Sequence, residues 1–144
     1  MNNRIALIPI LAVLFAGPAA GQTAEHFYNV DKEIRLEGTV REIALEPRYK
    51  GTAPFLVLRV EASAEKKMYK VEVSPSWFFG QDIHGGEKVK IVGSLSEARE
   101  DLPTVMAREL QLRGETFTLR DKRGFPSWQG GPRHKRGIRR FCGN

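Results

Sequence analysis

Residues 33–45 read Glu-Ile-Arg-Leu-Glu-Gly-Thr-Val-Arg-Glu-Ile-Ala-Leu, and the remainder of the chain is organised around this stretch. Ile34, Leu36 and Val40 keep a period of two through Gly38, which predicts a strand with one apolar and one polar face. Beyond Val40 the apolar positions move to the opposite parity. A glycine followed by such a shift is typical of a bulged, coiled strand that belongs to two sheets at once. The sequence therefore predicts the long first strand of a small barrel.

The segments downstream alternate between apolar runs and turn residues. Ser74 and Pro75 suit the cap and first position of a helix, so a short aromatic helix is expected to follow them, ending at Gly85 and Gly86. We expect this helix to plug the open end of the barrel, with Trp77 in the core. The segments expected to be strands are residues 55–61, 68–73, 87–94, 104–112 and 115–120.

The two ends of the chain differ from its middle. Residues 1–21 combine a positive start, an apolar run and small residues at Ala19 and Gly21, a pattern typical of a signal peptide cleaved near Gly21. The alternative, a membrane anchor, is disfavoured because the run is shorter than the roughly 20 apolar residues that a spanning helix needs. We therefore expect a secreted or periplasmic protein with no transmembrane segment in its mature chain.

The mature chain divides into three predicted parts. Residues 22–32 form a lead-in whose Phe27 and Tyr28 are expected to dock on the barrel. Residues 33–128 form the barrel, a C-terminal hairpin and an apolar clasp at 125–128. Residues 129–144 form a disordered basic tail.

The net charge of +6 resides in this tail. Without Arg4 and the tail cations, seventeen basic residues face all seventeen acidic ones. A charge block of this kind predicts nonspecific binding of a polyanion, either nucleic acid or an anionic envelope lipid, or else a solubilising extension without a partner. The five tail cations are Arg133, Lys135, Arg136, Arg139 and Arg140.

The predicted order, three strands, a helix and two closing strands, resembles the OB-fold, a five-stranded Greek-key barrel. Its most specific piece is Gly86 to Gly93, in which a turn glycine precedes alternating valine and isoleucine. The chain is also similar to small periplasmic OB-fold proteins of bacteria, in which segments like Thr116 to Asp121 and Phe125 to Trp128 follow the barrel. The resemblance implies a mainly β fold and a binding or accessory role.

An OB-fold that binds nucleic acid combines a basic groove with aromatic platforms. The balanced charge of the barrel disfavours this role here, because the basic footprint expected of such a binder is absent from the body. The residues that would form a ligand face on the barrel are Arg41, Arg48, Tyr49, Lys50, Phe55, Arg59 and Lys70.

No catalytic or metal-binding motif is present in the sequence. His26, His84, His134 and Cys142 have no paired-ligand spacing, and no nucleophile elbow or phosphate-binding glycine loop occurs. We expect no cofactor and no enzymatic activity. The single cysteine, Cys142, excludes an intrachain disulfide and leaves a covalent dimer as its predicted use. The sequence thus predicts a non-enzymatic OB-fold module with an unknown protein partner, or alternatively a polyanion binder acting through its tail.

Overall fold

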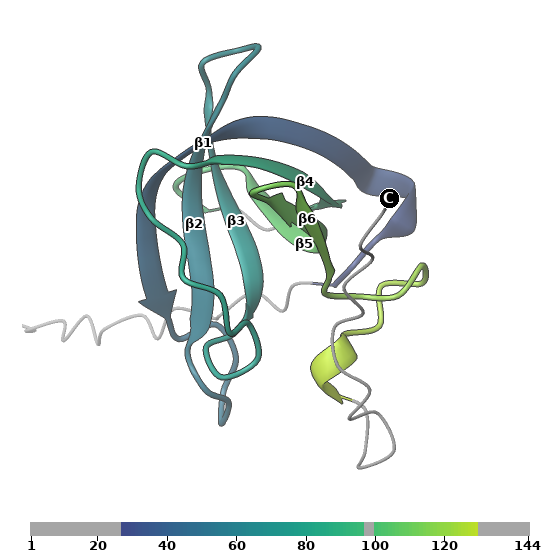
Figure 1. The fold of residues 1–144 in the computed structure, drawn as a ribbon. Coiled ribbons are helices and arrows are strands. Elements are labelled where there is room, and N and C mark those ends of the chain that lie inside the picture. The colour runs from purple at the N-terminus through teal and green to yellow at the C-terminus, as the bar shows by residue number, and fades with distance from the viewer. Residues whose placement is uncertain (1–26, 97–99, 130–144) are drawn as a thin grey trace, which may run out of the picture.

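The computed structural model describes residues 27–96 and 100–129, and their path is drawn in Figure 1. The signal-peptide prediction, the tail prediction from residue 130 onward and Cys142 lie outside the described residues. The elements of the described chain are η1 (Val30–Lys32), β1 (Glu33–Glu46), β2 (Phe55–Ala62), β3 (Met68–Pro75), β4 (Lys88–Leu95), β5 (Thr104–Leu112), β6 (Glu115–Thr118) and η2 (Ser127–Gln129).

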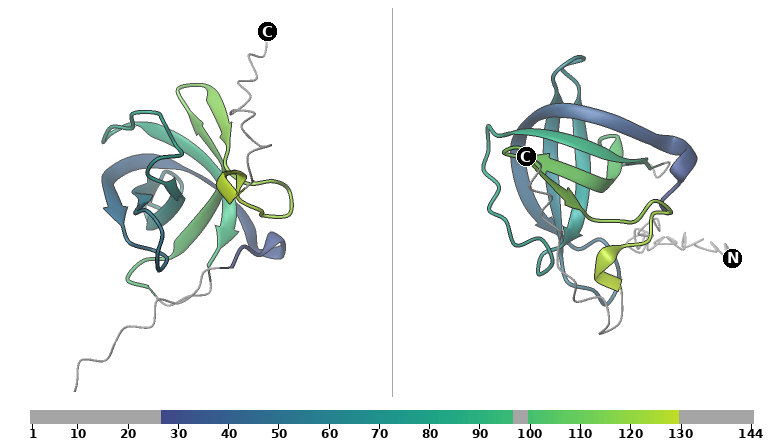
Figure 2. Two further views of the ribbon diagram at one scale, coloured as in Figure 1. Left: turned by 90° about the horizontal axis from the view of Figure 1, so that it is seen from below. Right: turned by 45° about the vertical axis from the view of Figure 1, so that its right-hand side comes forward.

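The strands form a closed barrel with one strand added outside it. Their order is β3-β2-β1-β4-β5-β6, with antiparallel pairing between neighbours. A parallel pairing of β3 with β5, from Lys70–Thr104 to Glu72–Met106, closes the ring. Figure 2 shows the strands curving around a common axis. The predicted OB-fold-like barrel of five strands with an extra hairpin strand is confirmed.

The strand β1 is coiled as its sequence predicts. Its residues 33–39 pair with β4, its residues 38–46 pair with β2, and the register shifts between Val40 and Glu42. At Gly38 the strands approach so closely that an added Cβ would lie 2.3 Å from the carbonyl oxygen of Glu61. Glycine is required there because any side chain would force β1 and β2 apart.

The core lies inside the barrel and consists of aliphatic side chains with two phenylalanines. Because side chains alternate along each strand, every barrel strand contributes one face to this interior. Its members with at most 1% exposure are Val40, Leu58, Val60, Val71, Val73, Ile91, Val105, Ala107, Leu110 and Leu119.

The predicted helix is absent. Ser74 and Pro75 are the last two residues of β3, where they pair with Leu56 and Phe55, and the connection from residue 76 to 87 contains no helix. Ser74 and Pro75 do not begin a helix because the pairing of β2 with β3 continues through both residues. Trp77 is 64% exposed, so its predicted place in the core is also wrong.

The connection nevertheless fills the barrel end with another aromatic residue. Phe79 is 5% exposed, and its ring centroid lies 5.2 Å from that of Phe117 on β6. Phe78 and Ile83 pack partly buried against the same core. An irregular segment thus supplies the apolar plug that the sequence assigned to a helix.

The flanking segments dock with one aromatic residue each. Tyr28 packs against Gly124, where an added Cβ would lie 2.3 Å from the tyrosine ring, and Trp128 packs on the barrel. Phe27 and Phe125 are 76% and 65% exposed, which contradicts the predicted docking of Phe27 and reduces the predicted clasp at 125–128 to its tryptophan. Trp128 and Tyr28 are both held by partners in the barrel, because the hydroxyl of Tyr28 donates to Glu33 of β1 and Trp128 packs against Phe55 of β2.

Candidate binding face

Five of the seven predicted ligand-face residues come together on the outer face of β2 and β3. Arg59 and Lys70 lie opposite each other in the β2–β3 register, and Phe55 begins β2 on the same face. Arg48 and Tyr49, from the connection between β1 and β2, fold over this face to reach Glu72. The structure therefore assembles most of the predicted set in one place.

The other two residues lie apart from this assembly. Arg41 occupies the bulge of β1 and forms an ion pair with Glu61, with 3.4 Å between Nε and Oε2. Lys50 is exposed in the turn after β1. Neither residue contributes to a shared site with the five.

A fully buried carboxylate, Glu72, is at the centre of the assembly. It accepts a hydrogen bond of 3.2 Å from Nε of Arg48 and one of 2.5 Å from the hydroxyl of Tyr49. A buried charge is tolerated only when it is paired and hydrogen-bonded, and these two donors meet that need. Burial, followed by the negative charge of Glu72, raises the pKa of Tyr49, so this phenol stays protonated.

The cations of the face are neutralised by a second set of carboxylates. Nη2 of Arg48 lies 2.6 Å from Oε1 of Glu100, and Nζ of Lys70 lies 3.1 Å from Glu100 and 2.9 Å from Asp101. Arg59 reaches Asp101 at 3.4 Å. We call these residues, together with Glu42, Glu46 and Glu72, the polar network.

The pKa directions agree with this pairing. Burial opposes the ionisation of Glu100, but hydrogen bonds from Arg48 and Lys70 outweigh it and lower the pKa of Glu100 to about 2. Burial alone would lower the pKa of Arg48 and of Lys70, yet their acidic partners raise both. All three groups are therefore charged at neutral pH.

A buried arginine, Arg120, joins the two flanking segments to this face. Arg120 comes two residues after the end of β6. Its guanidinium carbon lies 4.8 Å from the ring centre of Trp128 and 5.8 Å from that of Tyr28. Nη1 donates to the carbonyl oxygen of Gly124 at 3.2 Å, while Nε has no hydrogen-bond partner among the described residues. Burial lowers the pKa of Arg120, and the charge of Glu72 opposes that shift.

Aromatic contacts continue from the polar network to the surface. Trp128 lies edge-on to Phe55 and Phe78 with centroid distances of 5.8 and 5.4 Å, and Tyr49 lies 5.0 Å from Phe55. Edge-to-face packing of this kind stabilises each pair by about 0.5–1.5 kcal/mol beyond its buried area. The tryptophan is thereby fixed against both the barrel and the irregular connection.

This arrangement affects what the face can bind. OB-folds bind oligonucleotides on the face of strands 2 and 3 and on the loops that flank it. Here the chain's own loops and Trp128 cover that face, and Arg48, Arg59 and Lys70 are bound to carboxylates. A phosphate would have to displace those carboxylates before it could reach the cations.

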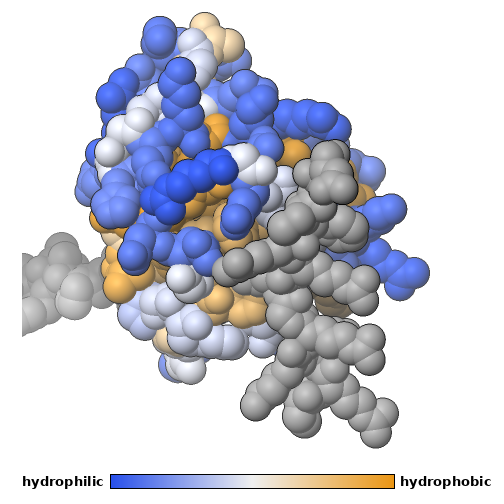
Figure 3. All heavy atoms as spheres, in the orientation of Figure 1, coloured by the Kyte–Doolittle hydropathy of each residue, from blue (hydrophilic) through white to orange (hydrophobic). Residues whose placement is uncertain are grey.

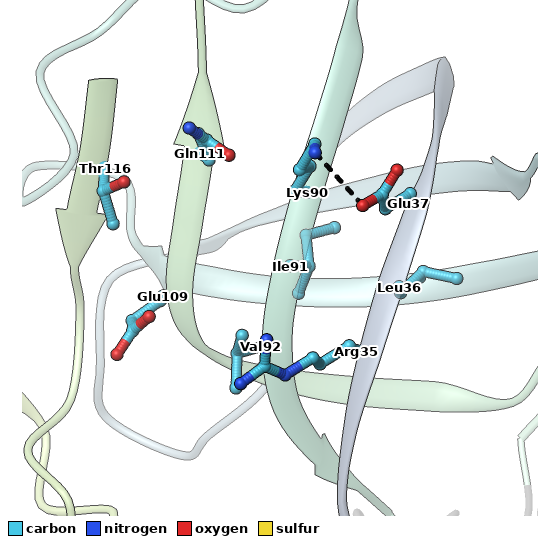
Figure 4. Close-up of a pocket in the computed structure, with 9 residues that line it drawn as sticks. All are labelled: Arg35, Leu36, Glu37, Lys90, Ile91, Val92, Glu109, Gln111 and Thr116. Carbon is cyan, nitrogen blue, oxygen red and sulfur yellow. Dashed lines mark ion pairs between the residues drawn. The ribbon is translucent and has the colours of Figure 1, made fainter. Parts of the chain in front are cut away.

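The opposite face of the barrel is open and polar. A shallow depression there crosses β1, β4, β5 and β6, and Figure 4 shows the side chains that line it. Nζ of Lys90 lies 3.2 Å from Oε1 of Glu37 across the β1–β4 pair, and Arg35 lies over Val92. These side chains occupy the polar face that the alternation of β1 predicts.

The residues that sequence reasoning missed are Glu72, Glu100 and Arg120. Alternation along β3 places Glu72 on the outer face, opposite the core residues Val71 and Val73, so its burial had no local signal and depends on the loop residues Arg48 and Tyr49 that cover it. Among the described residues, no three His, Cys, Asp or Glu side chains lie where they could hold a metal ion. No helix in residues 27–96 or 100–129 has the length and apolar character needed to cross a bilayer.

The fold and this face define a class of protein, a small OB-fold-like barrel whose usual ligand face is closed by its own loops. The chain belongs to the MamS/MamX magnetosome protein family, whose model matches residues 32–117. That match runs from η1 into β6 and covers the whole barrel. The barrel is consistent with the resemblance to small OB-fold proteins noted in the sequence. Comparisons with curated proteins and with solved structures gave no match.

Proposed function

We propose that the chain is a magnetosome-associated accessory protein whose barrel binds a protein partner without catalysing a reaction. The observation that supports this proposal is the family match, because it covers the barrel from residue 32 to residue 117 and no flanking segment. The part of the chain that matches the family is thus the barrel. Its functional surfaces are then to be sought on the barrel itself.

The polar network supports a non-catalytic role for the face where OB-folds bind their ligands. Its cations and carboxylates satisfy one another, and Tyr49 is held by Glu72. Groups paired in this way stabilise a structure but offer no free acid, base or nucleophile to a substrate. We therefore assign the network to holding the loops on the barrel.

The proposed location is the periplasmic side of the envelope. It rests on residues 1–21, whose sequence is typical of a signal peptide. An accessory protein exported in this way would meet the parts of its partners that face away from the cytoplasm.

The proposal is tested by cell fractionation. A tagged copy of the chain, expressed in a magnetosome-forming bacterium, is expected to be recovered with purified magnetosomes, detected by immunoblot. The matched control lacks residues 2–21 and is expected to stay in the cytosolic fraction. Recovery of the intact chain only in the general periplasmic or cytosolic fraction would overturn the magnetosome association.

A second candidate function is polyanion binding through the tail. One observation favours it over binding by the barrel: Arg48, Arg59 and Lys70 are all engaged by carboxylates. The excess of positive charge is then concentrated in residues 133–140 of the sequence. The salt titration described in the Discussion separates this function from the accessory role.

A further inference from the structure

The second half of β1 has a strand neighbour on one side only. The strand β4 pairs with residues 33–39, whereas β2 continues to pair with β1 as far as Glu46. Beyond Thr39, the described backbone hydrogen-bonds to this side of β1 at Val40, with Gly86 at 2.7 Å and Glu87 at 2.8 Å, and Gly85 lies beside the carbonyl oxygen of Arg41. Residues 42–46 therefore form a strand edge that no described strand covers.

The backbone groups that point to this edge follow from the ladder. The N–H and C=O of Val40 point to the β4 side, whereas the carbonyl oxygen of Glu37 accepts a hydrogen bond from the N–H of Ser63 on the β2 side. Direction alternates along an antiparallel strand, and the one-residue bulge before Glu42 shifts the alternation by one. After the bulge, Ile43 and Leu45 are the residues whose N–H and C=O point away from β2.

Apolar side chains accompany these free backbone groups. Ile43 and Leu45 lie opposite Leu58 and Leu56 and thus on the core-facing side, yet they are 38% and 61% exposed. Trp77, which is 64% exposed, lies at the same end of the barrel. It comes two residues after Pro75, which pairs with Phe55, and Phe55 in turn pairs with Glu46 at the end of β1. Figure 3 shows apolar surface low on the left, where β1 ends in Figure 1.

Such an edge is unusual in a protein without a partner for it. Natural sheets protect their edges with charges, prolines or covering segments, because an open apolar edge recruits other strands. Addition of an extended segment to a sheet edge is a common mode of peptide recognition, in which backbone hydrogen bonds give affinity and alternate side chains give specificity. The edge at Glu42–Glu46 has both components.

The first half of the same edge shows which strand fits. There β4 supplies residues 88–91, Lys-Val-Lys-Ile, with Lys90 paired to Glu37 at 3.2 Å and with Val89 and Ile91 in the core. The second half repeats the pattern of β1, with Ile43 and Leu45 on the inner face and Glu42 on the outer face. Glu42 lies 3.5 Å from Arg59, but its side chain is 59% exposed and can accept a second cation. A strand that alternates basic and apolar residues therefore complements both halves.

We infer that the edge of β1 at residues 42–46 is the docking site for an extended segment of a partner protein that alternates Lys or Arg with apolar residues. This inference rests on the proposed accessory function and names the surface through which it acts. A second copy of the chain fits less well. In antiparallel self-pairing, residues 42–46, Glu-Ile-Ala-Leu-Glu, offer no basic residue to oppose Glu42, and a pair centred on Ala44 sets Glu42 against Glu46 twice. Like charges in opposed positions destabilise a strand pair.

The test is a titration of isotope-labelled protein with the synthetic peptide Glu-Lys-Val-Lys-Ile-Val, which copies residues 87–92. The amide resonances of Ile43 and Leu45 are expected to shift and saturate. A peptide of the same composition, scrambled so that lysine falls on both faces, is expected to bind at least about tenfold more weakly, since it cannot match both faces of the edge.

Variants of Leu45 separate the backbone from the side chain. Leu45→Pro removes the N–H that points to the free edge and leaves the β1–β2 ladder intact, because proline is tolerated where its nitrogen faces away from a partner strand. We expect it to weaken peptide binding about tenfold or more, while Leu45→Val, which keeps the N–H, changes it less than about threefold. Thermal melting confirms that each variant is folded.

Three results would overturn the inference: shifts that map to β6 instead of residues 41–46, equal binding of the scrambled peptide, or no saturable shift in the wild-type protein. The wild-type shift map does not depend on whether Leu45→Pro folds. The titration also needs no magnetosomes, so its failure removes the docking edge without affecting the magnetosome association. Conversely, failure of the fractionation removes that association and leaves a measured docking edge in place.

Discussion

Phe79→Ala and Trp77→Ala are expected to have very different effects on stability, although the two aromatic residues are only two positions apart. Phe79 is 5% exposed and contacts Phe117 in the core, whereas Trp77 is 64% exposed. Truncating a buried phenylalanine costs about 3–5 kcal/mol, a large part of the roughly 5–15 kcal/mol that stabilises a domain. Truncating Trp77 loses only its edge contact with Phe78 at 5.9 Å, about 1 kcal/mol.

These free energies translate into melting temperatures that are easily told apart. For a domain of this size, 1 kcal/mol lowers the melting temperature by about 4–8 °C. Phe79→Ala should therefore melt at least about 12 °C below the wild type or fail to fold, and Trp77→Ala within about 8 °C of it. Thermal unfolding followed by circular dichroism measures both.

A conservative variant controls for the chemistry of the substitution. Phe79→Leu keeps most of the buried apolar volume, so it should retain more stability than Phe79→Ala. If Trp77→Ala were as destabilising as Phe79→Ala, the irregular connection would be packed through Trp77 instead. The account of the barrel plug given above would then be wrong.

Three further perturbations test other parts of the molecule. Gly38→Ala should destabilise the barrel strongly in thermal melting, because its Cβ would meet the carbonyl oxygen of Glu61 at 2.3 Å; wild-type stability would contradict this close approach. The lowered pKa of Glu100, about 2 against 4.5, contributes stability that is fully present above about pH 4.5 and is lost as the pH falls through 2. Glu100→Gln should therefore be less stable than the wild type at pH 7, by about 1–2 kcal/mol after solvent screening, and the difference should vanish only below about pH 2. A gap independent of pH in denaturant unfolding would refute the ion-pair assignment. Removal of residues 133–144 should abolish binding to heparin or DNA. In the intact chain, the slope of the logarithm of the binding constant against the logarithm of the salt concentration should be no steeper than about −4.5, because five cations are available. Equal binding by the truncated chain would assign that role to the barrel.

The strands could be predicted from the sequence because each strand is specified by the alternation of apolar and polar side chains among neighbouring residues. The bulge after Val40 was visible as a change of phase, and the close approach at Gly38 as a glycine inside a strand. The candidate ligand face could be named in part because alternation places Arg59 and Lys70 on one side of their strands. Arg41, predicted to belong to the same face, lies in the bulge of β1 and pairs with Glu61.

The sequence by itself thus determined the barrel, its strands and the concentration of charge at the C-terminal end. Tertiary structure alone decided which polar groups are buried. Glu72 is paired with Arg48, 24 residues before it, and the same arginine pairs with Glu100, 52 residues after it. The same is true of the plug, where Phe79 rather than Trp77 enters the core because β6 places Phe117 beside it. Such choices depend on contacts between strands distant in sequence, which local propensity and periodicity do not encode.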